Sequence, residues 1–567
     1  MFNKLVVVHL LGGRFMHYEV TLFQFFQPHI RQETSIEQLA TIWQCSSRYA
    51  KTIVQKLQQT QTIRWETSRG RGKKPYLTLL KTKQECVFEL FKQYWDKEQY
   101  EAGYALLGEH ELLNDLKIQD WLLHQYGIHQ TKNAEQIFRY PFYDVNLTFD
   151  PTEALSRHDA HFIKQLHEPL FKENELTGEI EGNLLFHYET TDYQRWRFIL
   201  RKGILFHNLK PLKASDVKYS LERIESLAKP YFDIVGIEII NDYELVFMLS
   251  KPFAILPDIL TSFRTVVLPE NQPDGKIGCG PFMLVEHSNK RLFLKTFERY
   301  FHTRPYIDGI EMIYTDQLTD FGISYIPYPN EIPQKKVTIQ DIGASYIVLN
   351  CNAGPLQQKD LRETIYALID PVQFVVGNNE MIASSWIPNK EVNTKFDAKT
   401  KSPPIHFPTL IIGYQQIRPD ANYLDKALIL QRQLEAYGIS SELQSIDLQK
   451  TVDEINDNVD IYIGGVTIGK QKNVSLLNTY YSKPKVFFVL LDEENKKWLS
   501  KRLEQIFSNE KSDASLQTFQ QIEHHLQSIY CLKFLTHRRY HRYIREDSIY
   551  EGLEFNDNGH IEYKKLY

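Results

Sequence analysis

The chain has 567 residues, of which 42% are hydrophobic and 24% are charged, and its formal net charge at pH 7 is −5. A chain of this length is too long for a single compact core, so we expect two or more domains. No apolar run approaches the roughly 20 residues of a membrane-spanning helix, so no such helix is expected. The five cysteines are scattered and odd in number, which fits no zinc site and indicates reduced thiols in a cytosol.

The first residues carry no export signal. The apolar run Leu5–Leu11 is too short for the core of a signal peptide, and no small-residue cleavage site follows it. Residues 1–15 are either a buried first strand or an artefact of an upstream start site. We therefore expect a cytoplasmic protein with no membrane attachment.

Charge is distributed unevenly along the chain. Residues 16–95 hold 12 Lys and Arg against 6 Asp and Glu, a net charge of +6, although the whole chain is at −5. A basic front on an acidic body indicates that the front binds a polyanion.

The front, residues 16–95, is predicted to be a winged helix-turn-helix domain of the α+β class. Apolar periodicity and turn residues predict three helices, at 20–26, 36–43 and 48–59. They also predict a β-hairpin whose strands are 63–67 and 75–80. Thr34-Ser35 can cap the second helix, and Ser46 or Ser47 the third. A short turn between these two helices completes the helix-turn-helix pattern.

Double-stranded DNA is the partner that this pattern indicates. Phosphates need cations at the wing, and base edges need polar side chains on the exposed helix face. Alone, the loop Gly70–Lys74 is equally well explained as a soluble hairpin tip, but the helices before it favour DNA binding. Tyr49, Ile53 and Leu57 are expected to face the core. The predicted DNA contacts are Ser46, Ser47, Arg48, Lys51, Thr52, Gln55, Arg69, Arg71, Lys73 and Lys74.

Residues 96–133 are predicted to be a helical connector, which continues a helical pattern that begins at residue 84. The connector either packs on the winged helix or joins two copies into a homodimer, which would match the two-fold symmetry of operators. The sequence leaves both alternatives open.

The body is organised around residues 195–224, RWRFILRKGILFHNLKPLKASDVKYSLERI. Trp196, Phe198 and Leu200 alternate with Arg197, Ile199 and Arg201 as in a strand, and a capped helix follows a turn and a loop. The order of residue types resembles the signature of extracytoplasmic solute-binding proteins of the peptide/nickel type. Further matches to that family lie at 143–151, 161–170, 279–282, 297–310 and 346–371.

This resemblance implies a two-lobed α/β fold of the periplasmic-binding-protein type (class II) over residues 134–567, with a ligand enclosed between the lobes. Lobe I is expected at 134–315 and 475–567, and lobe II at 316–474. Closure of the two lobes on the ligand would be a hinge motion.

A small-molecule ligand is expected, but the sequence does not identify it. Peptide binders of this family carry an Asp in lobe II for the amino end of the peptide, and residues 460–470 lack that acidic pair, which argues against a peptide. The basic run 537–545 suits an anion such as a phosphosugar, or is a solvated strand. Trp386 either stacks on the ligand or fills a core. The residues predicted to line the site are Tyr143, Cys279, Asn350, Trp386, Arg538 and Arg542.

Front and body together resemble the SgrR-type transcriptional regulators of sugar-phosphate stress. The resemblance implies a regulator whose body senses a small ligand, a sugar or phosphosugar among the candidates, and alters operator binding by the front. The alternative is the substrate-binding component of an ABC importer, which the missing export signal disfavours. The sequence shows no nucleophile elbow, phosphate-binding loop, metal cluster or dinucleotide fingerprint, so we predict neither an enzyme nor a cofactor.

Overall fold

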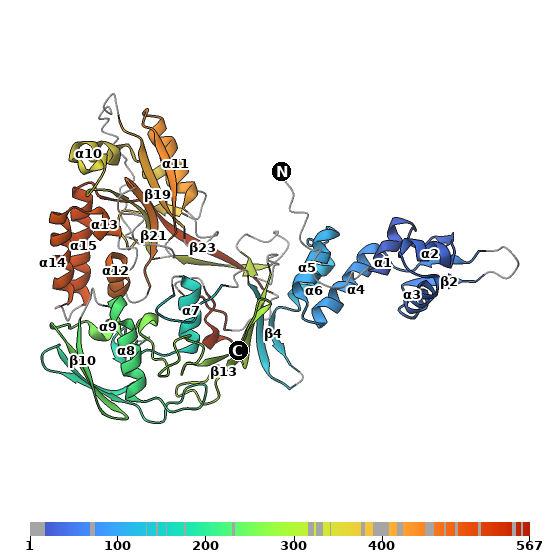
Figure 1. Cartoon of the computed structure of the whole chain (residues 1–567), viewed down its shortest axis with the longest axis horizontal. Coiled ribbons are helices and arrows are strands. Elements are labelled where there is room, and N and C mark those ends of the chain that lie inside the picture. Colours follow the sequence, from blue (N-terminus) through green and yellow to red (C-terminus); the bar gives the residue numbers. More distant parts are fainter. Residues whose placement is uncertain are drawn as a thin grey trace.

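The computed structural model describes residues 17–567 except 68–73, 132, 143–145, 155, 175–176, 229–232, 316–322, 325–332, 341, 376–379, 389–406, 417–422, 448–458, 470–471, 482–485, 508–511, 547–551 and 557–559. Figure 1 shows an elongated molecule with a small helical domain at one end, further helices in the middle and a large body at the other end. Within the described residues, no helix has the length and apolar character that crossing a membrane requires.

The front folds as a winged helix-turn-helix. Its elements are α1 (Tyr18–Thr21), η1 (Leu22–Gln24), β1 (Arg31–Glu33), α2 (Ile36–Ile42), α3 (Ser47–Gln59), β2 (Ile63–Glu66) and β3 (Tyr76–Leu79). β3 pairs antiparallel with both β1 and β2. The predicted caps form, because the hydroxyls of Ser35 and Ser46 accept backbone N–H groups, of Gln38 and Tyr49 respectively, at 3.2 Å each.

Two details of the front differ from the sequence prediction. The first helix, expected over 20–26, is a short α1 followed by a 3-10 turn that ends at Gln24. Tyr49 does not face the core, since it is 48% exposed. The buried face of α3 consists of Ala50, Ile53, Val54 and Leu57, which pack with Leu39 and Trp43 of the α2 region.

Three helices follow the wing, α4 (Lys83–Asp96), α5 (Tyr100–Glu109) and α6 (Leu116–Leu123). α4 falls almost wholly in the range predicted for the front, but it packs with α5, so from here on the connector means α4, α5 and α6. Its core is aromatic: Trp95 meets Tyr100, Trp121 and Tyr126 edge-on at 4.9–5.6 Å between ring centroids. Val20 of α1 belongs to the same hydrophobic cluster, and so does Ile313 of the body. The connector therefore packs on the winged helix, as one of the two alternatives proposed, and packs on the body as well.

Lobe I of the body contains two larger sheets. Its elements are β4 (Gly127–Gln130), β5 (Gln136–Phe142), α7 (Arg157–Leu166), β6 (Phe171–Glu173), β7 (Ile180–Gly182), β8 (Leu185–Thr190), β9 (Arg195–Leu200), α8 (Ala214–Ala228), β10 (Ile234–Asn241), β11 (Glu244–Leu249), α9 (Leu256–Ile259), η2 (Phe263–Thr265), β12 (Phe282–His287), β13 (Arg291–Thr296) and β14 (Gly309–Tyr314). The sheets have the orders β12-β13-β14-β5-β4 and β10-β11-β9-β8. The predicted alternation of β9 is confirmed, because Trp196, Phe198 and Leu200 are buried.

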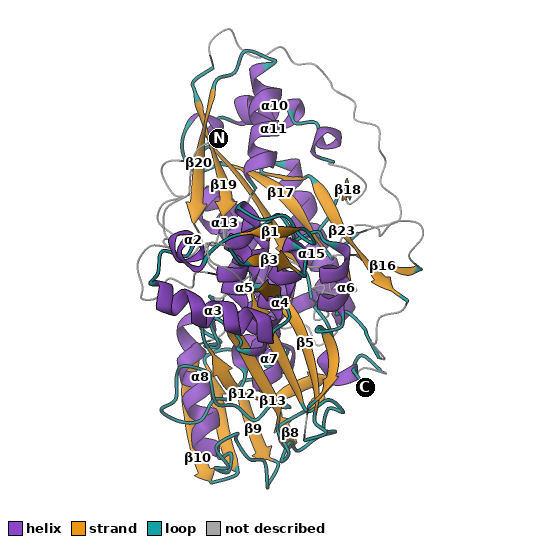
Figure 2. Cartoon of the chain, turned by 90° about the vertical axis from the view of Figure 1, so that its right-hand side faces the viewer, coloured by secondary structure: helices purple, strands orange, loops and turns teal. Residues whose placement is uncertain are grey.

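Lobe II is built on a five-stranded sheet of order β20-β19-β21-β17-β22. Its elements are β17 (Gly343–Leu349), η3 (Pro355–Gln357), α10 (Lys359–Leu368), η4 (Pro371–Phe374), β18 (Glu380–Ile382), β19 (Leu410–Gln416), α11 (Leu424–Glu435), β20 (Ser441–Asp447), β21 (Ile461–Thr467), α12 (Lys472–Tyr481), α13 (Val486–Leu490), α14 (Glu493–Phe507), α15 (Ser512–Ser528) and β22 (Leu532–Phe534). In Figure 2, β19 and β20 lie in the upper part of the body, whereas β8, β9, β10, β12 and β13 lie in the lower part.

The C-terminal boundary of lobe II lies further along the sequence than predicted. Residues 475–567 were assigned to lobe I, but β22 pairs with β17 in the sheet of lobe II. α15 packs against β22, and α12 and α14 pack against α15. Helices α12–α15 therefore belong with lobe II, and the chain leaves that lobe only after β22.

The strands that follow β22 and precede β17 connect the lobes. β23 (Thr536–Arg545) pairs antiparallel with β16 (Gln334–Gln340) along its second half and with the short β15 (Ile323–Ser324). Its first residues pair instead with β18 of lobe II. Figure 1 shows β23 running from lobe II toward the side of the body on which the connector lies.

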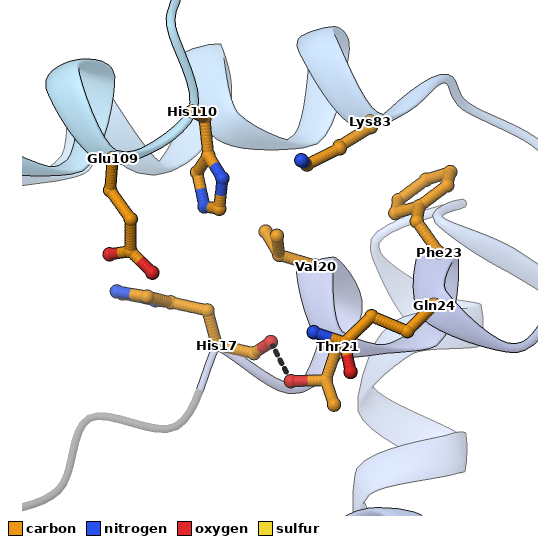
Figure 3. Close-up of a pocket in the computed structure, with 8 residues that line it drawn as sticks. All are labelled: His17, Val20, Thr21, Phe23, Gln24, Lys83, Glu109 and His110. Carbon is orange, nitrogen blue, oxygen red and sulfur yellow. Dashed lines mark hydrogen bonds between the residues drawn. The ribbon is translucent and has the colours of Figure 1, made fainter.

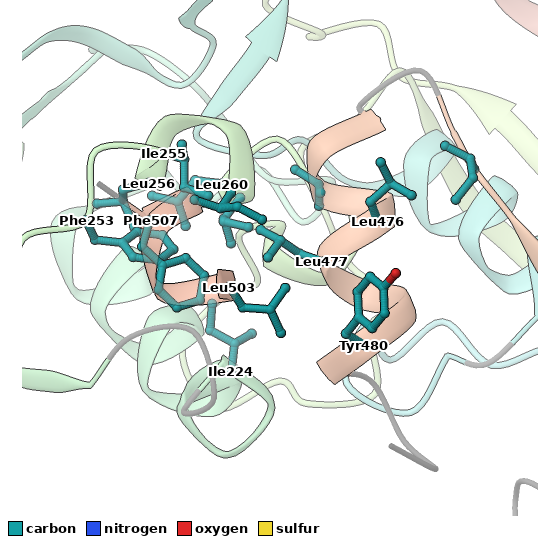
Figure 4. Packing of buried hydrophobic residues seen from close by; sticks show 14 of the residues in the cluster. Ile224, Phe253, Ile255, Leu256, Leu260, Leu476, Leu477, Tyr480, Leu503 and Phe507 are labelled. Carbon is teal, nitrogen blue, oxygen red and sulfur yellow. The ribbon is translucent and has the colours of Figure 1, made fainter. Parts of the chain in front are cut away.

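One hydrophobic cluster continues from lobe I into lobe II. In Figure 4, residues at and before α9 face α12 and the end of α14. The rings of Phe253 and Phe507 are 4.9 Å apart between centroids, and the N–H of Ala254 donates to the carbonyl of Phe507 at 2.9 Å. The two lobes are therefore in direct contact on this side.

Candidate nucleic-acid interface and ligand site

The exposed face of α3 carries the predicted DNA contacts. This face contains Ser46, Ser47, Arg48, Lys51, Thr52 and Gln55, all of which are exposed. The opposite face is buried against α2 and the hairpin, so this polar and basic face is the one that α3 can offer to a major groove. Tyr49 adds an exposed aromatic ring to it, a residue that sequence reasoning had placed in the core.

The wing is described only at its base. β2 and β3 form the predicted hairpin, with Trp65 opposite Leu77 in the register. Lys74 is exposed and lies two residues before the second strand, β3. Arg69, Arg71 and Lys73 lie outside the described residues, so their part in the DNA interface stays a prediction.

A pocket of about 260 Å³ lies where the winged helix meets the connector. Figure 3 shows Lys83 and Glu109 on opposite sides of the pocket with the ring of His110 between them. The hydroxyl of Tyr94, on α4, lies 3.2 Å from Nε2 of His17, beside α1. The joint between the two domains is thus partly polar, unlike the aromatic core that the connector forms within itself.

A charged cluster fixes the connector to lobe I. Glu311 of β14 accepts hydrogen bonds from Nε of Arg139 and Nη1 of Arg291, at 2.7 Å each, and its side chain is only 6% exposed. The same Nη1 of Arg291 lies 3.2 Å from a carboxylate oxygen of Glu98, which follows α4. The connector thus contacts lobe I through both an ion pair and apolar packing.

Trp386, predicted either to stack on a ligand or to fill a core, is fully buried in this structure. Its indole N–H donates to the hydroxyl of Tyr480 at 3.1 Å. The rings of Tyr346 and Phe534 meet it nearly perpendicularly at 4.9 and 4.8 Å between centroids. The structure thus places Trp386 in the cluster that joins the two lobes.

Replacing Trp386 by Ala should therefore lower the free energy of unfolding by about 3–5 kcal/mol, because a large cavity opens and the hydroxyl of Tyr480 loses its donor. Urea unfolding of the full chain measures this loss. Trp498→Ala is the matched control, since that ring is only partly buried, against His525, and should cost less. Equal unfolding midpoints for Trp386→Ala and the parent chain would contradict a core role.

Cys279 and Asn350 also occupy structural positions. Cys279 is fully buried, and burial raises the pKa of its thiol, so the thiol stays neutral and unreactive. The side-chain amide of Asn350 donates to the carbonyl of Val459 at 2.8 Å. Its carbonyl oxygen accepts the N–H groups of Asn352 and Ala353, which fixes the loop after β17.

The two arginines of β23 differ in exposure. The side chain of Arg538 is 39% exposed, with Nε 3.9 Å from a carboxylate oxygen of Glu380 and the guanidinium 5.3 Å from the ring centroid of Tyr423. Arg542 is only 4% exposed. Tyr143 lies outside the described residues. The predicted ligand set therefore stays a prediction.

Sequence reasoning missed a buried lysine beside Arg538. Nζ of Lys426 lies 2.9 Å from Glu380 and 2.9 Å from the hydroxyl of Thr536. Burial lowers the pKa of Lys426, and the neighbouring Glu380 opposes that shift. A lysine on an amphipathic helix gives no local signal of burial, because the carboxylate that pairs with it comes from β18, far away in the sequence.

Comparisons with known proteins agree with this architecture. The model of the bacterial extracellular solute-binding proteins, family 5 (middle), matches residues 179–389, and that of the sugar transport-related sRNA regulator N-terminal domain matches residues 14–129. The fold and its interface thus define the class: a two-lobed solute-binding protein preceded by a winged helix-turn-helix. The two matched models and the SgrR relatives together support an SgrR-type architecture, in which a regulator N-terminal domain precedes a family 5 solute-binding domain.

Among curated relatives, the uncharacterized protein YhjP of Bacillus subtilis is 29% identical over 360 residues, 60% of this chain and 62% of that protein. The HTH-type transcriptional regulator SgrR of Yersinia enterocolitica is 26% identical over 367 residues, 63% of this chain and 65% of that protein. The SgrR of Pectobacterium atrosepticum is 24% identical over 502 residues, 85% of this chain and 88% of that protein. The chain thus matches less than two thirds of the first two relatives.

Solved structures support the fold of the body. The oligopeptide-binding protein AppA of Bacillus subtilis, in complex with a nonapeptide, superposes with a TM-score of 0.58 at 18% identity, covering 76% of this chain and 99% of that one. NikA of Brucella suis, in complex with Fe(III)-EDTA, gives a TM-score of 0.61 at 15% identity over the same shares. At such identities the likeness concerns the fold alone.

Proposed function

We propose that the protein is a DNA-binding transcriptional regulator whose solute-binding body senses a small ligand and thereby changes how the winged helix holds operator DNA. One observation carries this proposal: the exposed, polar and basic face of α3 lies in a winged helix that is joined by packed helices to a solute-binding fold. The relatives from Yersinia and Pectobacterium, named as HTH-type transcriptional regulators, support it.

The route between the two sites runs through the connector. β4 follows α6 directly and forms the edge of the lobe I sheet beside β5. Ile313 of β14 packs with the connector core, which also includes Val20 of the winged helix. A ligand that favours one arrangement of the lobes by a few kcal/mol would therefore shift the population of connector positions, and with it the DNA affinity.

The ligand that we favour is a sugar or a phosphosugar. The matched N-terminal family is described as sugar transport-related, and Arg538 offers a partly exposed guanidinium near the point where β23 leaves lobe II. A guanidinium suits a phosphate, which it can bind through two parallel hydrogen bonds. We further propose that the protein acts in the cytoplasm and binds a two-fold symmetric operator as a homodimer.

A thermal-shift screen of the full chain tests the sensing step. Free sugars, sugar phosphates and oligopeptides are compared, because a ligand at 100 times its Kd stabilises the native state by about 2.7 kcal/mol. The ligand found is then added to the complex of the protein with its preferred duplex. We expect the duplex affinity to change at least fivefold. An affinity that is the same with and without that ligand would contradict the sensor role.

A further inference from the structure

Three histidines gather inside lobe I, outside the interfaces described above. His158 and His161 lie one turn apart on α7, and His560 belongs to the C-terminal segment, residues 552–556 and 560–567. The rings of His161 and His560 stack at 4.4 Å between centroids, and the ring of His158 meets His560 edge-on at 4.7 Å. We call these three residues the histidine cluster.

The cluster contains buried nitrogen atoms that form no hydrogen bond. His158 and His161 are 6% and 3% exposed. The Nε2 atoms of His161 and His560 are both buried without a hydrogen-bond partner. A neutral imidazole tolerates this, whereas a protonated one would place an unsatisfied charge in the core. The packing therefore accepts only the neutral form of these rings.

The surroundings of the cluster are basic. Burial, with the neighbouring His158 and Lys164, lowers the pKa of His161 to about 3. Burial also lowers the pKa of His560 well below 6.5, and groups on two elements lower it further. These groups are His161, His158 and Arg157 at α7 and Arg542 on β23.

No acidic group is among the strongest influences on the pKa of His161 or His560, so none offsets the basic groups. β12 and η2 also pack against α7. Their titratable and charged groups, Glu286, His287 and Arg264, are not among the strongest influences on His161 or His560. A proton on either ring would thus meet repulsion as well as desolvation.

The cluster attaches the C-terminal segment to the core of lobe I. Tyr563 lies against the ring of His161 at 4.9 Å between centroids, and its hydroxyl hydrogen-bonds that of Tyr140 on β5. Ile561 and Leu566 belong to the same hydrophobic cluster as Tyr140. The segment therefore covers residues of the sheet that continues through β4 into the connector.

We propose that the histidine cluster is an acid-sensitive latch, which holds the C-terminal segment on lobe I at neutral pH and releases it when the imidazoles are protonated. The imidazole pKa is about 6.5 in an exposed chain. Because the packed state has the lower pKa, it is favoured above pH 6.5, and this preference is lost as the pH falls from 6.5 toward 3. This property concerns the body and stands independently of the regulatory function.

Hydrogen exchange on the full chain at pH 7.5 and pH 5.0 tests the latch, with rates corrected for the intrinsic effect of pH. Each imidazole that becomes free on opening should lower the protection of the C-terminal segment by about 30-fold at pH 5.0. We call the loss of protection between pH 7.5 and pH 5.0 the acid step. His161→Phe and His560→Phe keep a flat ring but bind no proton, so the acid step should be smaller in each variant. The control His187→Gln changes a histidine of lobe I whose side chain is 55% exposed and should leave the step intact.

Equal protection of the segment at both pH values in the parent chain would overturn the proposal, and so would an undiminished acid step in folded His161→Phe. If the Phe variants do not fold, the measurement on the parent chain decides alone, since it needs no substitution.

Discussion

Replacing Arg71, Lys73 and Lys74 together by Ala should weaken binding of the full chain to duplex DNA by about 10²-fold at 0.15 M salt. Each lost phosphate contact makes the negative slope of log affinity against log salt shallower by about 0.9, so the loss of three contacts should make it shallower by about 2.7. The physical reason is that these cations release counterions from the phosphates, whatever the base sequence. Fluorescence anisotropy with a labelled duplex at several salt concentrations measures both quantities.

Two controls separate the wing from other effects of charge. Neutralising Lys251, Lys276 and Lys290, exposed cations of the body, should leave the slope unchanged. Thr52→Val, on the exposed face of α3, should alter which duplex is preferred while keeping the slope. If the wing variant keeps the affinity and slope of the parent chain, the wing assignment is wrong.

Glu311→Ala should lower the free energy of unfolding by about 2–3 kcal/mol, since it leaves two partly buried guanidinium groups without their shared carboxylate. Those groups belong to Arg139 and Arg291, whose side chains are 24% and 22% exposed. Urea unfolding measures the loss. The same change should reduce any effect of ligand on DNA affinity, because Arg291 also contacts Glu98 of the connector.

The matched control is Glu298→Ala. That carboxylate is 67% exposed and pairs with Arg304 at 3.0 Å in the same lobe, so its removal should cost less than about 1 kcal/mol. A loss for Glu311→Ala no larger than that of the control would show that the cluster does not fix the connector to lobe I.

Local signals in the sequence predict the winged helix well. The hydroxyl caps at Ser35 and Ser46 and the alternating hairpin strands depend on neighbouring residues, and the structure confirms them. Tyr49 was misplaced by counting in steps of four. Eight residues of an α-helix turn about 800°, which leaves Tyr49 some 80° away from Leu57. The true buried face follows steps of three and four, from Ala50 to Leu57.

Family motifs in the body predict its fold. Cys279 and Asn350 lie in matched motifs, Trp386 follows the last of them in the sequence, and each of the three is buried and packed or hydrogen-bonded within the chain. Such positions are constrained by folding. The boundary of lobe II was misplaced for another reason, since β22 joins β17 across more than 180 residues, and no local pattern records that pairing.

The most direct test of the account is the affinity of the full chain for duplex DNA as the salt concentration rises from 0.05 to 0.3 M. We predict binding at low salt and a slope of log affinity against log salt steeper than about −3, as several phosphate contacts by the wing and α3 require. An absence of duplex binding at 0.05 M salt, or an affinity independent of salt, would contradict the claim that the winged helix of this protein binds DNA.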